Sequence, residues 1–236
     1  MSKLTDEQVN SLFKFTRQHF VEFYDLQTEL VDHMANGIET LWLSHPDLTF
    51  EQARDREFKK FGVFGFMNVV EKRQAAMGSK YNRIVWKHFK EYMKVPKIVE
   101  FALAILATYF ILKLSSFSEV FFLGGILMLI VFYIIGLYFQ RRRINKNKSK
   151  SDDKKWMFKE MIYSHGALGG IAIVPLHFFN IFSGITEFNS MNDYWFIALS
   201  ITICSFYLFL YIMIIEIPKR AEEYLEQTYP EYKFAD

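Results

Sequence analysis

A strongly basic segment, residues 141–155, separates two pairs of long apolar runs in this sequence. It holds eight Lys or Arg residues and two Asp residues, which gives it a net charge of +6. Short loops rich in Lys and Arg remain on the cytoplasmic side of a bilayer. Basic residues also precede the first run and follow the last, whereas the short loops inside each pair carry acidic residues. We therefore expect four membrane crossings, with both ends of the chain in the cytoplasm.

The four apolar runs are long enough to be membrane-spanning helices, which need about 20 mostly apolar residues. They cover residues 99–114, 120–139, 161–185 and 194–217. The mean hydropathy of the whole chain is only +0.06, because polar and apolar segments are segregated along it. The basic segment divides the runs into two hairpins, so we predict a four-helix transmembrane domain over residues 98–217.

Charge divides the residues before this domain into two parts. Residues 1–71 contain seven Lys or Arg and twelve Asp or Glu, a net charge of −5, whereas residues 72–97 contain eight Lys or Arg and only Glu91, a net charge of +7. We predict an all-α protein in which a small cytoplasmic helical domain precedes the four transmembrane helices. Its parts are a cytoplasmic head (1–78), a basic amphipathic neck (79–97), the transmembrane domain (98–217) with its cytoplasmic basic loop (141–155), and a cytoplasmic tail (218–236).

Two capping boxes mark helix starts in the head. In each, a Thr is followed three residues later by a Gln: Thr5 by Gln8 and Thr49 by Gln52. The two side chains of such a pair satisfy the free N–H groups at a helix start. Residues 21–43 carry apolar residues at steps of three and four, which predicts a long amphipathic helix. Its apolar stripe comprises Leu26, Leu30, Met34, Ile38 and Leu41, and its acids, expected to turn mostly away, are Glu22, Asp25, Glu29, Asp32 and Glu39.

The sequence FGVFGF, residues 61–66, predicts a tight corner after the third helix of the head. Gly62 and Gly65 can adopt positive φ angles, and the aromatic residues around them can pack against one another. Phe64 is the candidate for an exposed apolar contact with a partner, since an apolar patch rimmed by charge is typical of an interaction site.

The neck has an apolar and aromatic face with basic residues elsewhere. The face comprises Tyr81, Ile84, Val85, His88, Phe89, Tyr92 and Met93. A basic amphipathic helix of this kind can lie on an anionic membrane surface. It can equally form a stalk that packs against the head or against a second copy of the chain, and the sequence leaves these alternatives open.

Glu29, Asp32 and His33 lie at spacings of three and four, so they occupy adjacent positions on one helix surface. Two carboxylates and an imidazole could ligate a metal, but a complete site needs ligands from another element. No recognisable ligand spacing supplies them. We therefore assign no metal site and interpret the three residues as a helix-packing or partner-contact surface.

The third apolar run is interrupted by polar and helix-bending residues, among them His177 and Asn180 at a spacing of three. Polar side chains within a membrane face the bundle interior rather than lipid. An ionisable intramembrane residue is a candidate functional site, yet no acid lies deep enough to complete a proton relay. We expect His177 and Asn180 to form a structural hydrogen bond between helices.

The sequence contains none of the motifs GxxxxGK[ST], GxGxxG at a strand–helix junction, GxSxG or HExxH. We therefore predict no catalytic residues, no cofactor and no enzymatic activity. The basic loop and neck could bind nucleic acid electrostatically, but membrane lipids explain the same charges with fewer assumptions. We expect lipids as partners and no direct contact with nucleic acid.

The head resembles the small domain called HAAS, the helix-turn-helix-associated alpha-helical signalling domain. The resemblance lies in the stretch from Glu29 to Phe66 and covers roughly 60 of the 236 residues. It rests on a Glu-Leu-x-Asp-His helix, a linker, an amphipathic helix with Glu and Ala, and a Phe-Gly turn. The matching residues are Glu29, Leu30, Asp32 and His33, then Glu51 and Ala53, then Phe61 and Gly62. The resemblance implies a domain that precedes transmembrane helices in a protein paired with a PadR-like transcription regulator.

These observations predict a non-enzymatic protein of the bacterial inner membrane with a signalling or regulatory role. Its cytoplasmic head is expected to bind a cytoplasmic protein or to self-associate. The alternative is a small permease or transporter subunit, and a functional partnership with an ATPase rather than a regulator would distinguish it.

Overall fold

The computed structural model describes residues 3–148, 154–164, 177 and 191–234 of the chain. Every regular element in these ranges is a helix, which confirms the all-α prediction. The chain divides into two compact units. One comprises residues 1–77 with 151–160, and the other comprises residues 78–150 with 161–235. We describe each unit by itself.

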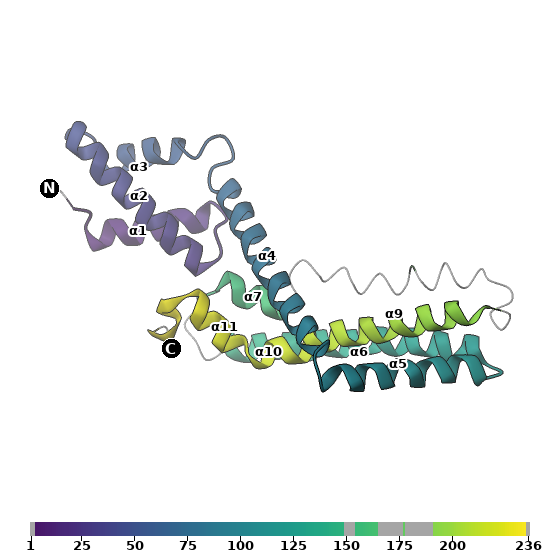
Figure 1. Cartoon of the computed structure of the whole chain (residues 1–236). Coiled ribbons are helices and arrows are strands. Elements are labelled where there is room, and N and C mark those ends of the chain that lie inside the picture. The colour runs from purple at the N-terminus through teal and green to yellow at the C-terminus, as the bar shows by residue number, and fades with distance from the viewer. Residues whose placement is uncertain (1–2, 149–153, 165–176, 178–190, 235–236) are drawn as a thin grey trace. The chain divides into compact units, whose positions relative to one another are not determined.

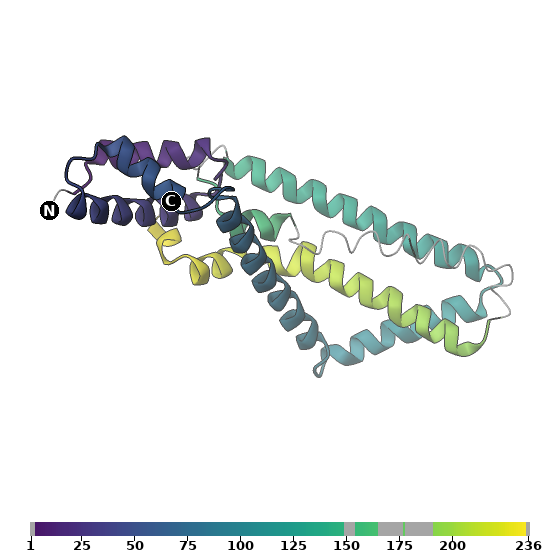
Figure 2. The ribbon, with the colours of Figure 1, turned by 90° about the horizontal axis from the view of Figure 1, so that it is seen from above.

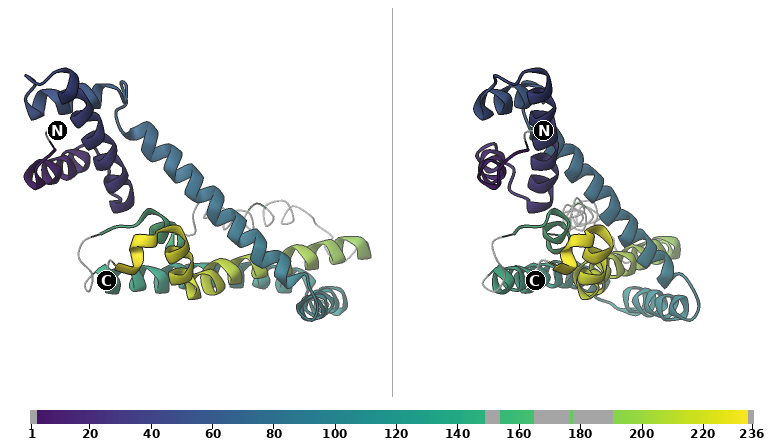
Figure 3. Two further views of the ribbon diagram at one scale, coloured as in Figure 1. Left: turned by 60° about the vertical axis from the view of Figure 1, so that its left-hand side comes forward. Right: turned by 90° about the vertical axis from the view of Figure 1, so that its left-hand side faces the viewer.

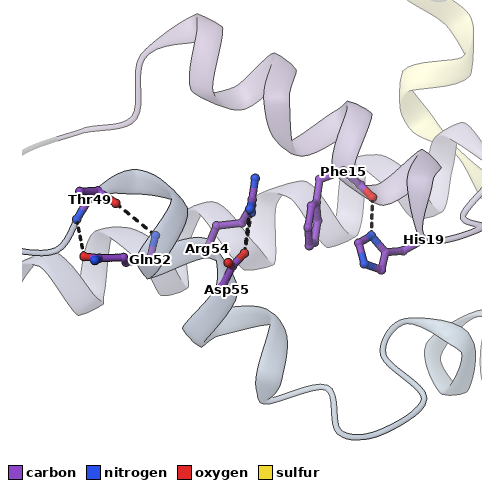
Figure 4. Close-up of polar contacts among 6 residues, drawn as sticks. All are labelled: Phe15, His19, Thr49, Gln52, Arg54 and Asp55. Atoms are coloured by element: carbon purple, nitrogen blue, oxygen red, sulfur yellow. Dashed lines mark hydrogen bonds and ion pairs between the residues drawn. The ribbon is translucent and has the colours of Figure 1, made fainter.

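The first unit is built from three complete helices and parts of two others (Figure 1). The complete helices are α1 (Asp6–Gln18), α2 (Tyr24–Ser44) and α3 (Phe50–Lys59), and the others are the start of α4 (Met67–Tyr92) and the start of α7 (Met157–Tyr163). Both predicted capping boxes are present. At the second, Thr49 Oγ1 accepts the Gln52 N–H at 3.3 Å while Gln52 Oε1 accepts the Thr49 N–H at 3.2 Å (Figure 4).

The core of this unit follows the predicted stripe of α2, which packs against both α1 and α3. Leu26, Leu30, Met34 and Ile38 are buried, and Leu41 is half-buried. The long amphipathic helix therefore forms because its apolar face is covered from two sides.

The corner between α1 and α2 contains Phe20 in the left-handed region, with φ of 65°. Its side chain is 79% exposed. An L-residue costs about 1–2 kcal/mol in this conformation. The turn closes α1 all the same, because the Val21 N–H donates to the Thr16 carbonyl at 3.1 Å and the Val21 side chain is fully buried.

The second unit contains three long apolar helices, seen from two sides in Figures 1 and 2. They are α5 (Lys97–Leu114), α6 (Ser118–Lys148) and α9 (Asp193–Tyr211), which continues as a π-helical turn η3 (Ile212–Glu216) and as α10 (Ile217–Lys219). Helix α9 packs against both α5 and α6. The shared core consists of Leu112, Phe122, Ile126, Phe196 and Leu199.

Two of these segments are long and apolar enough to cross a membrane, Ser118–Arg142 and Asp193–Lys219. A third is added if α4 and α5, which meet at an angle of 83°, are counted as one bent span. The described residues therefore give two to three candidate spans and fit a membrane protein. The predicted third span, residues 161–185, lies largely outside the described residues, and its first three residues belong to α7.

The predicted apolar face of the neck exists, but it is covered by the chain's own C-terminal part (Figure 3). Tyr81, Val85 and His88 are buried, and the ring of Phe89 stacks on that of Phe209 with centroids 4.4 Å apart. The tail folds into α11 (Ala221–Thr228) and a 3-10 turn η4 (Pro230–Phe234). Much of the face predicted to contact lipid, the head or a second copy thus packs within this unit.

Candidate functional site

The three candidate residues of α2, Glu29, Asp32 and His33, are all exposed. They do not converge on a common point. Glu29 Oε2 lies 3.8 Å from Nη2 of Arg73, whereas the His33 ring meets Phe61 with centroids 5.5 Å apart. Within the described ranges, no three His, Cys, Asp or Glu side chains are placed to hold a metal ion.

The glycine corner forms as predicted around two residues with positive φ, Gly62 at 81° and Gly65 at 54°. A Cβ atom on Gly65 would lie 2.8 Å from Cζ of Phe58, so this glycine also allows a close approach. The aromatic cluster behind the corner comprises Phe15, His19, Phe58, Phe61 and Phe66. These rings fill the inner side of the glycine corner, so the residues on its outer side face solvent.

His19 and Arg54 fix the aromatic cluster with polar contacts (Figure 4). The Nδ1 atom of His19 lies 2.8 Å from the Phe15 carbonyl. The Arg54 guanidinium lies 4.6 Å from the centroid of the Phe15 ring and pairs with Asp55 at 2.8 Å. A guanidinium over an aromatic face stabilises the packing of that ring.

The outer face of the corner is an apolar patch of Val63, Phe64 and Met67, which we call the corner patch. Val63 is 98% exposed, Phe64 is 72% exposed and Met67 is 44% exposed. Two exposed cations, Lys59 and Lys60, precede it in the chain. An apolar patch rimmed by charge is typical of an interaction surface.

A second feature of the head is the segment formed by residues 154–160, which we call the strap. Its residues Trp156, Met157 and Phe158 are buried. The strap backbone is held at its start, because the Tyr24 N–H donates to the Lys155 carbonyl at 2.7 Å. The Trp156 ring packs edge-on against the Tyr24 ring with centroids 5.4 Å apart. The strap therefore completes the core at the start of α2.

Asp25 contradicts the expectation that the acids of α2 turn away from the core. It is 6% exposed, and its Oδ1 accepts the Met157 N–H at 3.1 Å. A carboxylate at a helix start satisfies a free N–H group and interacts favourably with the helix dipole. Asp25 is buried because α7 brings it a donor from a distant part of the sequence.

The second unit holds a polar contact between the neck and the tail. The ring nitrogen Nε2 of His88 lies 2.6 Å from the Tyr224 hydroxyl, and Nδ1 lies 3.5 Å from Oε2 of Glu91. Burial lowers the pKa of His88, while the nearby Glu91 opposes that change. Burial also raises the pKa of Tyr224. The contact holds α11 on α4.

The predicted intramembrane pair is only partly described. His177 is exposed, whereas Asn180 and the residues on either side of His177 lie outside the described residues. The proposed hydrogen bond of His177 and Asn180 between helices therefore stays a prediction.

No family model matches the chain, and no curated protein or solved structure matches it either. Sequence reasoning found the corner patch through the glycines and missed the strap. The apolar triplet Trp156, Met157 and Phe158, directly after two lysines and before the third run, was the available signal.

Proposed function

We propose that this chain is a non-enzymatic membrane protein with a signalling or regulatory role, whose cytoplasmic head binds a protein partner. The observation that carries the proposal is the corner patch. Val63 is almost entirely in solvent and Phe64 is 72% exposed, although the rings behind them form a tightly packed cluster. A corner built this rigidly presents its apolar side chains in a fixed geometry, and pre-organisation of that kind favours binding.

The membrane arrangement that we propose has four crossings in the bacterial inner membrane, with both termini in the cytoplasm. The pair between Lys113 Nζ and Asp193 Oδ2, at 2.7 Å, joins the end of α5 to the start of α9. Helices α6 and α9 therefore both run away from the same end of the unit. If both cross the bilayer, the chain between them has to cross back, which supports a further span in residues 161–185.

The resemblance to HAAS domains suggests the class of partner. We propose a PadR-like transcription regulator, held at the membrane by the head and released when the transmembrane part responds to a stimulus. Such a partner would contact the corner patch, and the exposed residues Glu29, Asp32 and His33 of α2 would be a second contact surface.

Photocrosslinking tests the proposal in living cells. A photoreactive amino acid is placed at position 64 of the full chain and, as a matched control, at position 43, where Leu43 is 67% exposed at the end of α2. We expect one discrete protein adduct from position 64, identified by mass spectrometry as a transcription regulator. The change Val63→Asp should reduce that adduct, because a charge in the patch opposes apolar contact.

Two results would contradict the proposal. Absence of any protein adduct at position 64, or the same adducts at positions 64 and 43, would show that the corner patch is not a specific site. An ATPase crosslinked at position 64 would favour the alternative of a transporter subunit.

A further inference from the structure

The strap packs against the corner between α1 and α2 through two consecutive basic residues. Lys155 Nζ pairs with Oε2 of Glu22 at 2.8 Å. Lys154 Nζ lies 4.8 Å from the centroid of the Tyr24 ring, a cation–π contact. The site thus offers a carboxylate and an aromatic face to two consecutive basic residues.

The next residues of the strap are recognised by burial and by one backbone hydrogen bond. Trp156, Met157 and Phe158 are 4%, 2% and 0% exposed. Asp25 accepts the N–H of Met157, the first residue of α7. The corner between α1 and α2 therefore binds a defined pattern of residues: two cations, an aromatic residue, and the start of a helix.

The strap is separate in sequence from α1, α2 and α3, so its departure from this site interrupts none of these three helices. Its ion pair is weakly held, since the Lys155 and Glu22 side chains are 43% and 68% exposed, and exposed pairs contribute little to stability. Residue 161, directly after the strap, is where the third apolar run begins in the sequence.

We propose that the α1–α2 corner is a docking site for a basic-aromatic segment that starts a helix, and that the strap is its resident, displaceable occupant. The inference rests on the proposed function, because it assumes that the head is an interaction module. A partner segment with the chemistry of residues 154–158 docks on Glu22, Tyr24 and Asp25 once the strap has left. The site is available to such a segment only while the strap is undocked.

A labelled synthetic peptide of residues 152–163 tests the site in trans. Its binding is measured by fluorescence anisotropy on the full-length protein in lipid nanodiscs. The wild-type site is occupied, whereas Trp156→Ala in the protein weakens the resident strap. We expect at least about tenfold tighter peptide binding to the Trp156→Ala protein than to wild type. Adding Tyr24→Ala to that variant should abolish the gain, and a peptide carrying Trp156→Ala should bind neither protein.

A second variant and a second measurement test whether misfolding of the Trp156→Ala protein causes the change in peptide binding. Lys154→Glu with Lys155→Glu places two acids beside Glu22 and so weakens the strap without leaving a cavity in the core. Peptide binding to this variant should again be tighter than to wild type, by less than for Trp156→Ala. In proteins with Cys204→Ser, the thiol of Met157→Cys should be protected while the strap is docked. It should react rapidly when Lys154→Glu and Lys155→Glu are added. Ser79→Cys, at an exposed position of α4, should react equally in both backgrounds.

Equal peptide affinity for wild type and both strap variants would overturn the inference, and so would a lack of binding to variants that retain the wild-type helical signal. Loss of peptide binding with an intact adduct at position 64 would refute this inference alone. Peptide binding without any adduct at position 64 would instead refute the proposed corner-patch function.

Discussion

Gly37 and Glu57 show at the scale of single residues how closely α2 and α3 approach. A Cβ atom on Gly37 would lie 2.2 Å from Cδ of Glu57. The Glu57 residue is 3% exposed and its carboxylate pairs with Lys60 Nζ at 2.5 Å. A buried carboxylate is tolerated only with such a partner. Gly37 therefore keeps open the space that the carboxylate occupies.

The change Gly37→Ala should lower the free energy of unfolding of the head by about 1–3 kcal/mol, because it forces the buried carboxylate away from its position. Gly78→Ala is the matched control, since a Cβ atom at that helical position meets nothing within 4 Å. The control should gain up to about 1 kcal/mol from helix propensity. Denaturant unfolding of the full-length protein, followed by circular dichroism, measures both changes.

The double variant Gly37→Ala with Glu57→Ala separates the clash from other effects. It should recover the stability of Glu57→Ala alone, because the side chain that clashes is gone. An equal loss in the presence and absence of Glu57 would contradict the close approach of the two residues.

Sequence reasoning predicted the apolar residues of the head better than its polar ones. The stripe from Leu26 to Ile38 is buried as expected, because helical spacing alone decides which residues share a face. Asp25 was placed outside, although it is buried. Spacing cannot reveal that Met157, more than a hundred residues later, brings a donor to it.

At the scale of elements, the sequence likewise predicted the apolar face of the neck but not the element that covers it. Spacing identified the face of α4 that contains Tyr81, Val85 and His88, and this face is buried. Its cover was not predicted, since α11 and the end of α9 follow more than a hundred residues later. A hydrophobic face tells which side of a helix is covered, whereas the covering element depends on the whole fold.

The contact of α11 with α4 should weaken in acid because of His88. Burial lowers the pKa of His88 below its usual value of 6.5. The stabilisation is therefore complete above pH 6.5 and is lost as the pH falls from there toward the folded-state pKa. The charged groups around the imidazole are Glu91, Arg220, Glu216 and Lys87.

Thermal unfolding of wild type and His88→Gln between neutral and mildly acidic pH checks this prediction. The variant should lose less stability than wild type over the acidic range, because Gln does not titrate. Parallel curves for the two proteins would show that His88 does not carry the pH dependence. Tyr224→Phe should cost about 1 kcal/mol near neutral pH through the lost hydrogen bond.

The strap gives a prediction about the head as a fragment. Residues 1–78 alone lack Trp156, Met157 and Phe158, whose burial is worth a few kcal/mol in total. A fragment in which a flexible linker joins residues 154–164 to residue 78 should be more stable by about that amount. Urea unfolding compares the two, with Trp156→Ala in the linked fragment as control. Equal midpoints for all three would contradict the role of the strap.

At the scale of the whole molecule, binding of a cytoplasmic partner depends on which residues face the cytoplasm. Charge alone predicted the topology, because the Lys and Arg residues gather in the basic loop and near the ends of the apolar runs. The packing of α9 on α5 and α6 was beyond prediction, since uniformly apolar helices have no distinct face in their sequence. The pair of Lys113 with Asp193 joins two segments expected on the outer side.

The positions that report on topology can now be chosen from the structure. Ser118 is a poor reporter because it is buried and donates to the Ser115 carbonyl at 2.7 Å. Ser116 and Asn192 are exposed near the ends of α5 and α9, and Asn10 is exposed on α1. Ser149 lies in the basic loop. Single cysteines at these four positions, in a chain with Cys204→Ser, cover both sides of the proposed membrane arrangement.

Labelling of intact cells with a membrane-impermeant thiol reagent therefore decides whether the head can meet a cytoplasmic partner at all. We expect Ser116→Cys and Asn192→Cys to react from outside, and Asn10→Cys and Ser149→Cys to react only after the membrane is permeabilised. Reaction of Asn10→Cys in intact cells would place the head outside and contradict the proposed function.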